Sequence, residues 1–146
     1  MKSRWVRAMT LAALCSGYVA CSAPRANTVQ DVMRDPAKHI GQRIAMAGEI
    51  EQVISPTAFV MEDRSPGGRE ILVLTKTPLS PSVQPLRSMD EFRMQLENQQ
   101  VRVRGPVELF SIAEAERRLQ TDLDDMALRQ YEGRLVIFAD DIDFKR

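Results

Sequence analysis

The sequence contains very little cysteine and histidine, and this excludes several kinds of site. Of its 146 residues, two are cysteines, Cys15 and Cys21, and one is a histidine, His39. Both cysteines precede the region that we expect to fold, so the folded domain has no pair for an internal disulfide. His39 has no other histidine to act with, and we expect a surface or capping residue rather than an acid-base group. We therefore predict no metal site and no cofactor.

The sequence also lacks the motifs of known catalytic chemistry. It has no Gly-x-Ser-x-Gly turn for a nucleophile, and Gly67-Gly68 lacks the Gly-Lys-Ser or Gly-Lys-Thr of a phosphate-binding loop. Aspartates recur at 122, 124 and 125 and at 140, 141 and 143, but without the loop glycine and final glutamate of an EF-hand. We therefore expect a protein that is not an enzyme.

A long apolar run is missing as well, although a shorter one opens the chain. Lys2, Arg4 and Arg7 are followed by thirteen uncharged residues, Ala8 to Ala20. A membrane-spanning helix needs about 20 apolar residues, whereas a basic start and a short apolar run that ends in small residues are typical of an export signal. We interpret residues 1–20 as a signal peptide.

The end of this run, Val19-Ala20-Cys21, resembles the lipobox of bacterial lipoproteins, in which the cysteine carries diacylglycerol and becomes the new N-terminus. Tyr18 departs from that pattern, which usually has an aliphatic residue there. Ordinary signal peptidase, acting after Ser22 or Ala23, is the alternative and would give a secreted or soluble periplasmic protein. We expect lipid on Cys21, a tether over residues 21–27, and anchoring in the outer membrane if the host has one, because Ser22 replaces the aspartate that retains many lipoproteins at the inner membrane.

No excess of basic charge remains once the signal is removed. Without Lys2, Arg4 and Arg7, 17 basic residues face 20 acidic ones, a net charge of about −3. Nucleic-acid-binding domains usually carry a basic patch or stripe. The composition therefore disfavours a nucleic-acid partner.

From residue 28 to residue 146 the patterns predict one domain of five short strands with helical insertions. Apolar and polar residues alternate from Ile44 to Glu51 and from Val101 to Leu109, each time around a central glycine, Gly48 or Gly105. A central glycine indicates a bulge or a sharp coil, and Pro106 indicates an edge or a bulge. The remaining strands are expected at 58–61, 70–74 and 134–139, the first two joined by a turn at 63–68.

Helices are expected between these strands and before them. Thr28 and Asp31 form a capping box for a short first helix, and Pro36 fits the first turn of a second segment that stops at Gly41. A helix is expected within 90–99. Ser111 and Glu114 form another capping box, at the start of a helical insert that we expect to restart near Gln120.

Five strands in this order, with a helical connection between the third and the fourth, suggest a small closed Greek-key barrel of the OB type. The stretches DPAKHIGQRIAMAGEIEQVISPTAFVMEDRSPGGREILVL, VRVRGPVELF and YEGRLVIFADDI resemble the small OB-fold proteins that bacteria export, often as lipoproteins. This family is largely without assigned activity. The helical insert between strands four and five departs from a minimal OB barrel, and we expect that it covers the face where other OB proteins bind ligands.

In an OB arrangement the first and fourth strands are neighbours. We therefore expect Glu49 and Glu51 to lie beside Arg102 and Arg104, as cross-strand pairs that support the sheet.

Three functions remain open at this point. The preferred one is a non-enzymatic module, anchored in the envelope, that binds a protein, a peptide or another envelope component, with Phe59, Phe110 and Tyr131 as candidate contacts. The alternative for these three rings is core packing. The second function is oligonucleotide binding, for which Arg102, Arg104, Arg117 and Arg118 are the local basic residues. The third is a hydrolase that uses paired carboxylates, from Glu49, Glu51 or the aspartates.

Overall fold

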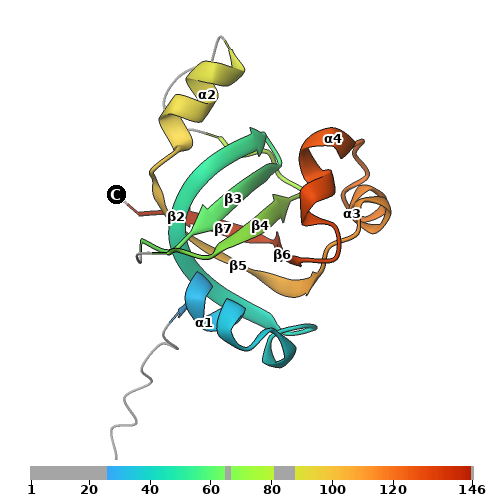
Figure 1. Cartoon of the computed structure of the whole chain (residues 1–146). Helices are drawn as coiled ribbons and strands as arrows, with labels where there is room; N and C mark the ends of the chain where they lie inside the picture. Colours follow the sequence, from blue (N-terminus) through green and yellow to red (C-terminus); the bar gives the residue numbers. More distant parts are fainter. Residues whose placement is uncertain (1–25, 65–66, 81–87, 146) are drawn as a thin grey trace, which may run out of the picture.

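The structure is a computed structural model, and it describes residues 26–64, 67–80 and 88–145. Seven strands form one sheet (Figure 1): β1 (Asn27–Thr28), β2 (Arg43–Ser55), β3 (Ala58–Glu62), β4 (Glu70–Thr75), β5 (Gln100–Leu109), β6 (Leu135–Ala139) and β7 (Asp141–Phe144). The helices are α1 (Val29–Arg34), α2 (Met89–Leu96), α3 (Ile112–Leu119) and α4 (Asp125–Leu128), with 3-10 turns at Pro36–Lys38 and Arg129–Tyr131. None of the helices in the described ranges is long and apolar enough to cross a membrane.

Five of the strands close into a barrel in the order β2-β3-β4-β6-β5, and β5 pairs back to β2. The pairs are antiparallel except for β4 and β6, which are parallel. An α-helix, α2, lies between the third and fourth barrel strands in chain order. This is the predicted architecture, so the OB-like fold is confirmed.

At each of the two central glycines an added Cβ would collide with the backbone of a neighbouring strand. A Cβ on Gly48 would lie 2.7 Å from the Glu62 carbonyl oxygen, and one on Gly105 would lie 1.9 Å from that of Phe138. Strand β2 is long and curved, because it pairs with β5 through its first half and with β3 through its second. Its register with β3 shifts twice, between Ile50 and Gln52 and between Val53 and Ser55, which adds to its bend.

Two hydrophobic cores lie on opposite sides of the barrel wall. The first fills the barrel interior with inward side chains such as Met46, Ile50 and Ile137, and α1 and α2 contribute Val32, Phe92 and others to it. Thr28 caps α1 through the predicted capping box with Asp31. The second core lies between the helical insert and the outer face of β3, β4 and β6. The barrel is therefore buried on both faces along these three strands.

The insert starts and breaks in ways that the sequence predicted only in part. Helix α3 ends at Gln120, which adopts a left-handed conformation with φ of 56°, and Asp124 caps α4, so the predicted restart is confirmed. The predicted capping box at Ser111 is wrong, because the Ser111 side chain makes no cap hydrogen bond. Instead the Ile112 amide donates to Glu132 Oε2 at 3.0 Å. A carboxylate from the far end of the insert thus caps its first helix.

Candidate functional site

The three aromatic residues proposed as ligand contacts are all buried. Phe59 is inside the barrel, at 0% exposure, whereas Phe110 and Tyr131 lie beneath the insert, at 2% and 3%. A ligand could reach them only by displacing what covers them. In this structure the three rings occupy packing positions, as the alternative interpretation expected. Cys21 and the other residues of the signal and tether before residue 26 lie outside the described residues.

The face that binds ligands in many OB domains is covered in this one. Oligonucleotides and oligosaccharides commonly bind such barrels on the face of the second and third strands, which here are β3 and β4. Val60 and Leu72, from the outer side of those strands, pack in the same core as Leu119, Leu123 and Leu128 of the insert. Fully burying an apolar side chain of this size contributes about 1.5–3 kcal/mol. The insert is therefore held on the face by a core and not only by surface contacts.

The acidic residues that border this face do not form a carboxylate pair set up for catalysis. Glu51 lies at the first register shift of β2, and burial together with repulsion from Glu62 and Glu70 raises its pKa. Glu70 forms an ion pair with Arg134 at 3.1 Å. In the described ranges no group of three or more histidine, cysteine or acidic side chains is arranged to hold a metal ion.

The predicted charge pairs between the first and fourth strands are wrong, although those strands are neighbours as expected. Arg102 and Arg104 lie opposite Ala47 and Ala45, while Glu49 lies opposite Gln100. Glu49 bonds instead to Arg64. An additional strand, β7, pairs with β5 and brings its own acidic residues to Arg104.

Strand β7 pairs with β5 and carries the aspartates that the sequence analysis considered as calcium ligands. Arg104 forms ion pairs with Asp141 and with Asp143, the latter at 3.2 Å. Asp140 pairs with Arg43. Each of these carboxylates thus has an arginine partner, and their role in the structure is to attach the last strand to the barrel.

A single extra residue separates β6 from β7. Val107 pairs with Ile137 and Arg104 with Asp141, so the two residues of β5 between these pairs face three residues, Phe138 to Asp140, at the junction of β6 and β7. The amide of Asp140 donates to the Arg104 carbonyl at 2.9 Å, which identifies this residue as part of a β-bulge. The bulge lies opposite Pro106, whereas β5 itself, where Pro106 predicted an edge or a bulge, pairs with β2 without a register shift.

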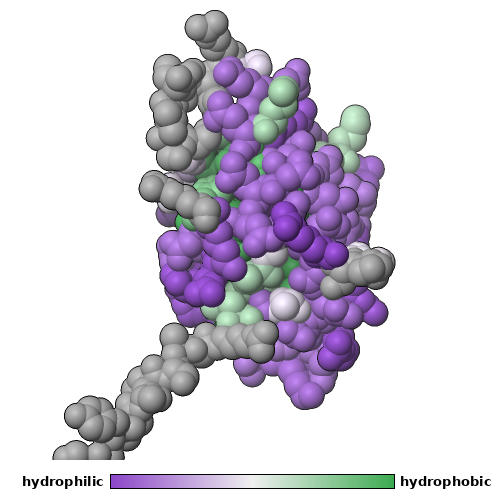
Figure 2. Space-filling model, turned by 90° about the vertical axis from the view of Figure 1, so that its left-hand side faces the viewer, coloured by the Kyte–Doolittle hydropathy of each residue, from purple (hydrophilic) through white to green (hydrophobic). Residues whose placement is uncertain are grey.

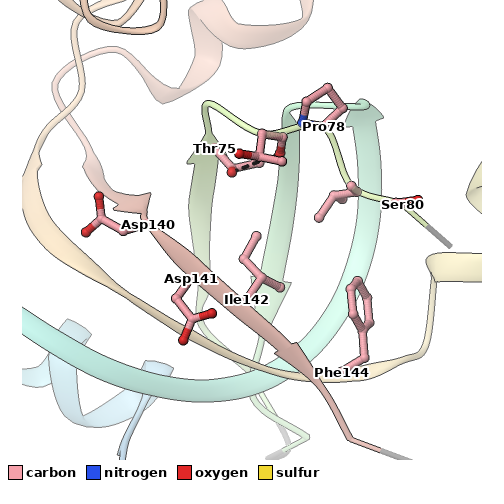
Figure 3. A pocket seen from close by; sticks show the side chains of 9 residues that line it. Thr75, Pro78, Ser80, Asp140, Asp141, Ile142 and Phe144 are labelled. Carbon is pink, nitrogen blue, oxygen red and sulfur yellow. Dashed lines mark hydrogen bonds between the residues drawn. The ribbon is translucent and has the colours of Figure 1, made fainter. Parts of the chain in front are cut away.

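Beyond this bulge the last strand and the segment that follows β4 diverge and leave a groove (Figure 3). The groove, which we call the β7 groove, has a volume of about 350 Å³. In Figure 3 the Ile142 and Phe144 side chains point toward the segment 75–80, and Asp141 points to the opposite side of the strand. Ile142 and Phe144 pack against the barrel core, of which Leu79 is a member. The lining residues are Thr75, Thr77, Pro78, Leu79, Ser80, Asp140, Asp141, Ile142 and Phe144.

The β7 groove thus combines an apolar floor with a polar rim. Thr75 is buried and its hydroxyl donates to the Thr77 carbonyl at 3.0 Å, which fixes the start of the 75–80 segment. Thr77 and Ser80 are exposed at the rim. A floor of this kind with a few polar groups is typical of pockets that bind a ligand.

A second groove of about 400 Å³ lies on the other side of the 76–78 segment, between the turn of β2 and β3 and the insert. Ile54, Leu123 and Leu128 give it an apolar wall, and Lys76 and Asp122 give it charges of both signs. Outside these grooves, the exposed large hydrophobic side chains of the described residues are Ile40, Met89, Met94, Leu109 and Met126. Figure 2 shows one face of the molecule, which is mostly hydrophilic with small separate hydrophobic areas.

The sequence analysis missed β7 and therefore the groove. A signal was present, because Asp141, Ile142, Asp143 and Phe144 alternate between polar and apolar as a half-buried strand does. The preceding run, Leu135 to Ala139, is buried throughout. The bulge between the two breaks the period, so the alternation was not recognised as a continuation of the strand.

No protein-family model and no curated protein matches this chain. Among solved structures, it is similar to OBody AM1L10 bound to hen egg-white lysozyme, with 16% sequence identity and a TM-score of 0.40, over 75% of this chain and 83% of the other. It is also similar to OBody AM3L09 bound to hen egg-white lysozyme, with 17% identity and a TM-score of 0.37, over 73% and 84% of the two chains. The assignment of an OB-like barrel rests on the strand order and pairing described above.

Proposed function

We propose that this protein is a non-enzymatic binding domain of the bacterial envelope, held on the membrane by lipid on Cys21, and that it binds a protein or peptide in the β7 groove. The observation that carries the binding site is the apolar floor of Ile142, Phe144 and Leu79 beside the exposed rim of Thr77 and Ser80. The basic start, the apolar run and the small residues before Cys21 support export and lipidation.

Two further features favour a protein or peptide over the other candidates. An oligonucleotide needs aromatic rings for stacking beside a basic groove, but Phe59, Phe110 and Tyr131 are buried, and the ring in the β7 groove, Phe144, has no basic residue among the described lining residues. The charged residues at the β7 groove are Asp140 and Asp141, and no basic residue in the described ranges lines the groove to attract phosphates. A hydrolase needs a carboxylate in reach of a substrate, whereas these two are engaged by Arg43 and Arg104.

Anchoring is tested by the intact mass of the protein recovered from the membrane fraction of its host. We expect a mature chain that starts at a diacylated Cys21, and a Cys21→Ser variant that leaves the membrane fraction. A wild-type chain that starts unmodified at Ala23 or Pro24 in the soluble fraction would mean simple secretion.

Binding is tested in the same cells with a photo-reactive phenylalanine analogue at Ser80, on the groove rim, and at the exposed Gln130 as the matched control. We expect protein adducts from position 80 and few from position 130. Adducts that are removed by nuclease instead of protease would restore the oligonucleotide hypothesis. Equal adduct formation at both positions would contradict the groove as the binding site.

A further inference from the structure

Backbone hydrogen bonds to β5 involve every second residue of β7, and the residues between them have N–H and C=O groups that do not bond to β5. The Lys145 amide donates to the Gln100 carbonyl at 2.8 Å, immediately after the strand. In an antiparallel pair, residues that exchange hydrogen bonds with the partner alternate with residues whose N–H and C=O point the other way. Asp143 and Asp141 therefore bond to β5, and the backbone N–H and C=O groups of Ile142 and Phe144 point away from β5, toward the free edge of β7 that borders the groove.

These backbone groups have no strand beside them in the described part of the chain. Strand β7 pairs there with β5 and with no other strand. The segment that faces β7 across the groove already forms backbone hydrogen bonds on its other side. The Thr75 amide donates to the Thr57 carbonyl at 2.9 Å, and the Leu79 amide donates to the Pro56 carbonyl at 2.7 Å. The groove is thus an open sheet edge with an apolar floor, and such edges pair readily with another chain.

The charges on the outward side of β7 determine which residues a strand that pairs with it should carry. The Asp141 and Asp143 side chains are 49% and 57% exposed, and Arg104 contacts them from the β5 side. A strand added at the free edge would place its own outward residues next to these aspartates. Because like charges on adjacent strands destabilise a sheet, the β7 strand of a second copy would be disfavoured, whereas lysine or arginine at those positions would be favoured.

We propose that β7 accepts an additional strand, an extended peptide segment in which Lys or Arg alternates with apolar residues. The apolar residues contact Ile142, Phe144 and Leu79 in the β7 groove, the basic residues lie beside Asp141 and Asp143, and the peptide backbone bonds to Ile142 and Phe144. This recognition mode combines main-chain hydrogen bonds with pockets for alternate side chains. It specifies the partner of the proposed function and rests on it.

The test uses the processed protein with a capped peptide of alternating lysine and valine, seven residues long. Two further versions carry backbone N-methyl groups, one on all of its lysines and the other on all of its valines. Both keep the charge of the unmodified peptide. We expect the unmodified peptide to bind. One of the two methylated versions should bind at least tenfold more weakly, since its methyl groups replace the N–H donors that face β7. The other version should bind as the unmodified peptide does. Equal effects of both versions, or no binding by any peptide at millimolar concentration, would overturn the proposal.

Hydrogen exchange measured by NMR provides a readout inside the protein. The amides of Ile142 and Phe144 should exchange rapidly in the free protein and at least tenfold more slowly with saturating peptide. The amide of Asp143, which bonds to β5, should already be protected before the peptide is added. Protection at 142 and 144 in the free protein would mean that this edge is occupied and would overturn the proposal.

A pair of charge variants tests the role of the aspartates. Asp143→Asn should weaken peptide binding by about two- to fivefold, the range for one cross-strand charge pair. Asp122→Asn, which removes one negative charge at the second groove, should leave the affinity for the peptide unchanged. A peptide with glutamate in place of lysine should not bind. A loss of binding with Asp122→Asn instead would place the peptide in the second groove.

The outcome separates this inference from the proposed function. If adducts form at Ser80 in cells while the amides of Ile142 and Phe144 remain unprotected by peptide, the groove binds a ligand by some means other than strand addition. If no adducts form at Ser80, the proposed function itself fails. A dimer in sedimentation experiments that disappears when peptide is added would show that a second copy occupies the edge, against the charge argument.

Discussion

Gly105 lies against the backbone of Phe138 so closely that a Cβ at position 105 would be 1.9 Å from the Phe138 carbonyl oxygen. The Phe138 backbone cannot retreat, because β6 is paired with β4 on one side and with β5 on the other. This contact lies within the two residues of β5 that face the Asp140 bulge. The same contact therefore affects both the packing of β5 against β6 in the barrel and the position at which β7 begins beside the groove.

We therefore predict that Gly105→Ala destabilises the protein by about 3 kcal/mol or more, since the overlap is with backbone rather than with a mobile side chain. The midpoint of urea unfolding provides the measurement. Gly67→Asn is the control, because a Cβ there meets nothing within 4 Å and asparagine tolerates a positive φ. Equal stability of Gly105→Ala and wild type would contradict the close approach of β5 and β6.

The capping arrangement of α3 gives a second prediction. Glu132→Ala removes the acceptor for the Ile112 amide and should cost about 0.5–1 kcal/mol. Ser111→Ala should cost less than Glu132→Ala, because the Ser111 side chain makes no cap hydrogen bond. Thermal unfolding of the two variants compares them directly, and the opposite order would restore the capping box that the sequence indicated.

Glu51 gives a prediction about pH. Partial desolvation, together with the charges of Glu62 and Glu70, raises its pKa above the usual value of 4.5. A raised folded-state pKa means that the contribution of this group to stability is fully present below the unfolded pKa and is lost as the pH rises through the folded pKa. Glu51→Gln should therefore stabilise the protein at pH 7 and lose that advantage below about pH 4.

The expected gain at pH 7 is small, about 0.5 kcal/mol or less, because the side chain is exposed and solvent screens its interactions. Unfolding midpoints at several pH values measure it. Glu114→Gln is a matched control that should not reproduce the gain, because Glu114 forms an ion pair with Arg117. A Glu51→Gln variant that is less stable than wild type at pH 7 would mean that the carboxylate is favourably engaged.

Arg104 holds β7 through two aspartates, and its removal should release that strand. We expect Arg104→Met to cost about 1 kcal/mol, with a smaller cost in high salt, since two exposed ion pairs are lost. Exchange at the Lys145 amide should increase. Arg117→Met, which loses one pair within α3, should leave that amide unchanged. No change in Lys145 exchange in Arg104→Met would mean that backbone pairing alone holds β7.

The barrel could be predicted from the sequence because alternation and glycine positions are local signals. Strand β5 alternates between inward valines and outward polar residues, and its glycine stands where the next strand passes. The burial of Phe59, Phe110 and Tyr131 could not be predicted with the same ease, since it depends on which side of a strand is covered. One indication was available, because β4 and β6 read as apolar runs without alternation, as strands buried on both faces do.

Ion-pair partners were less predictable than strands. The neighbouring positions of β2 and β5 suggested pairs between Glu49 and the arginines, but a pair depends on register and on every other charge nearby. The register places Gln100 opposite Glu49, and Arg64 reaches that carboxylate from the loop after β3. Asp141 and Asp143 then bind Arg104. None of these choices is determined by the spacing of charges along the chain.

The Asp140 bulge has a consequence for how such a domain could change over generations. Ala139 faces the barrel interior and so does Ile142, with Asp141 outward between Asp140 and Ile142. Removal of the codon for Asp140 would leave inward and outward residues in regular alternation and would keep Asp141 opposite Arg104. The last strand would then run straight instead of bending at the bulge. Gain or loss of one codon, with no other substitution, is thus a short mutational path between a domain whose last strand bends beside the groove and one whose last strand runs straight.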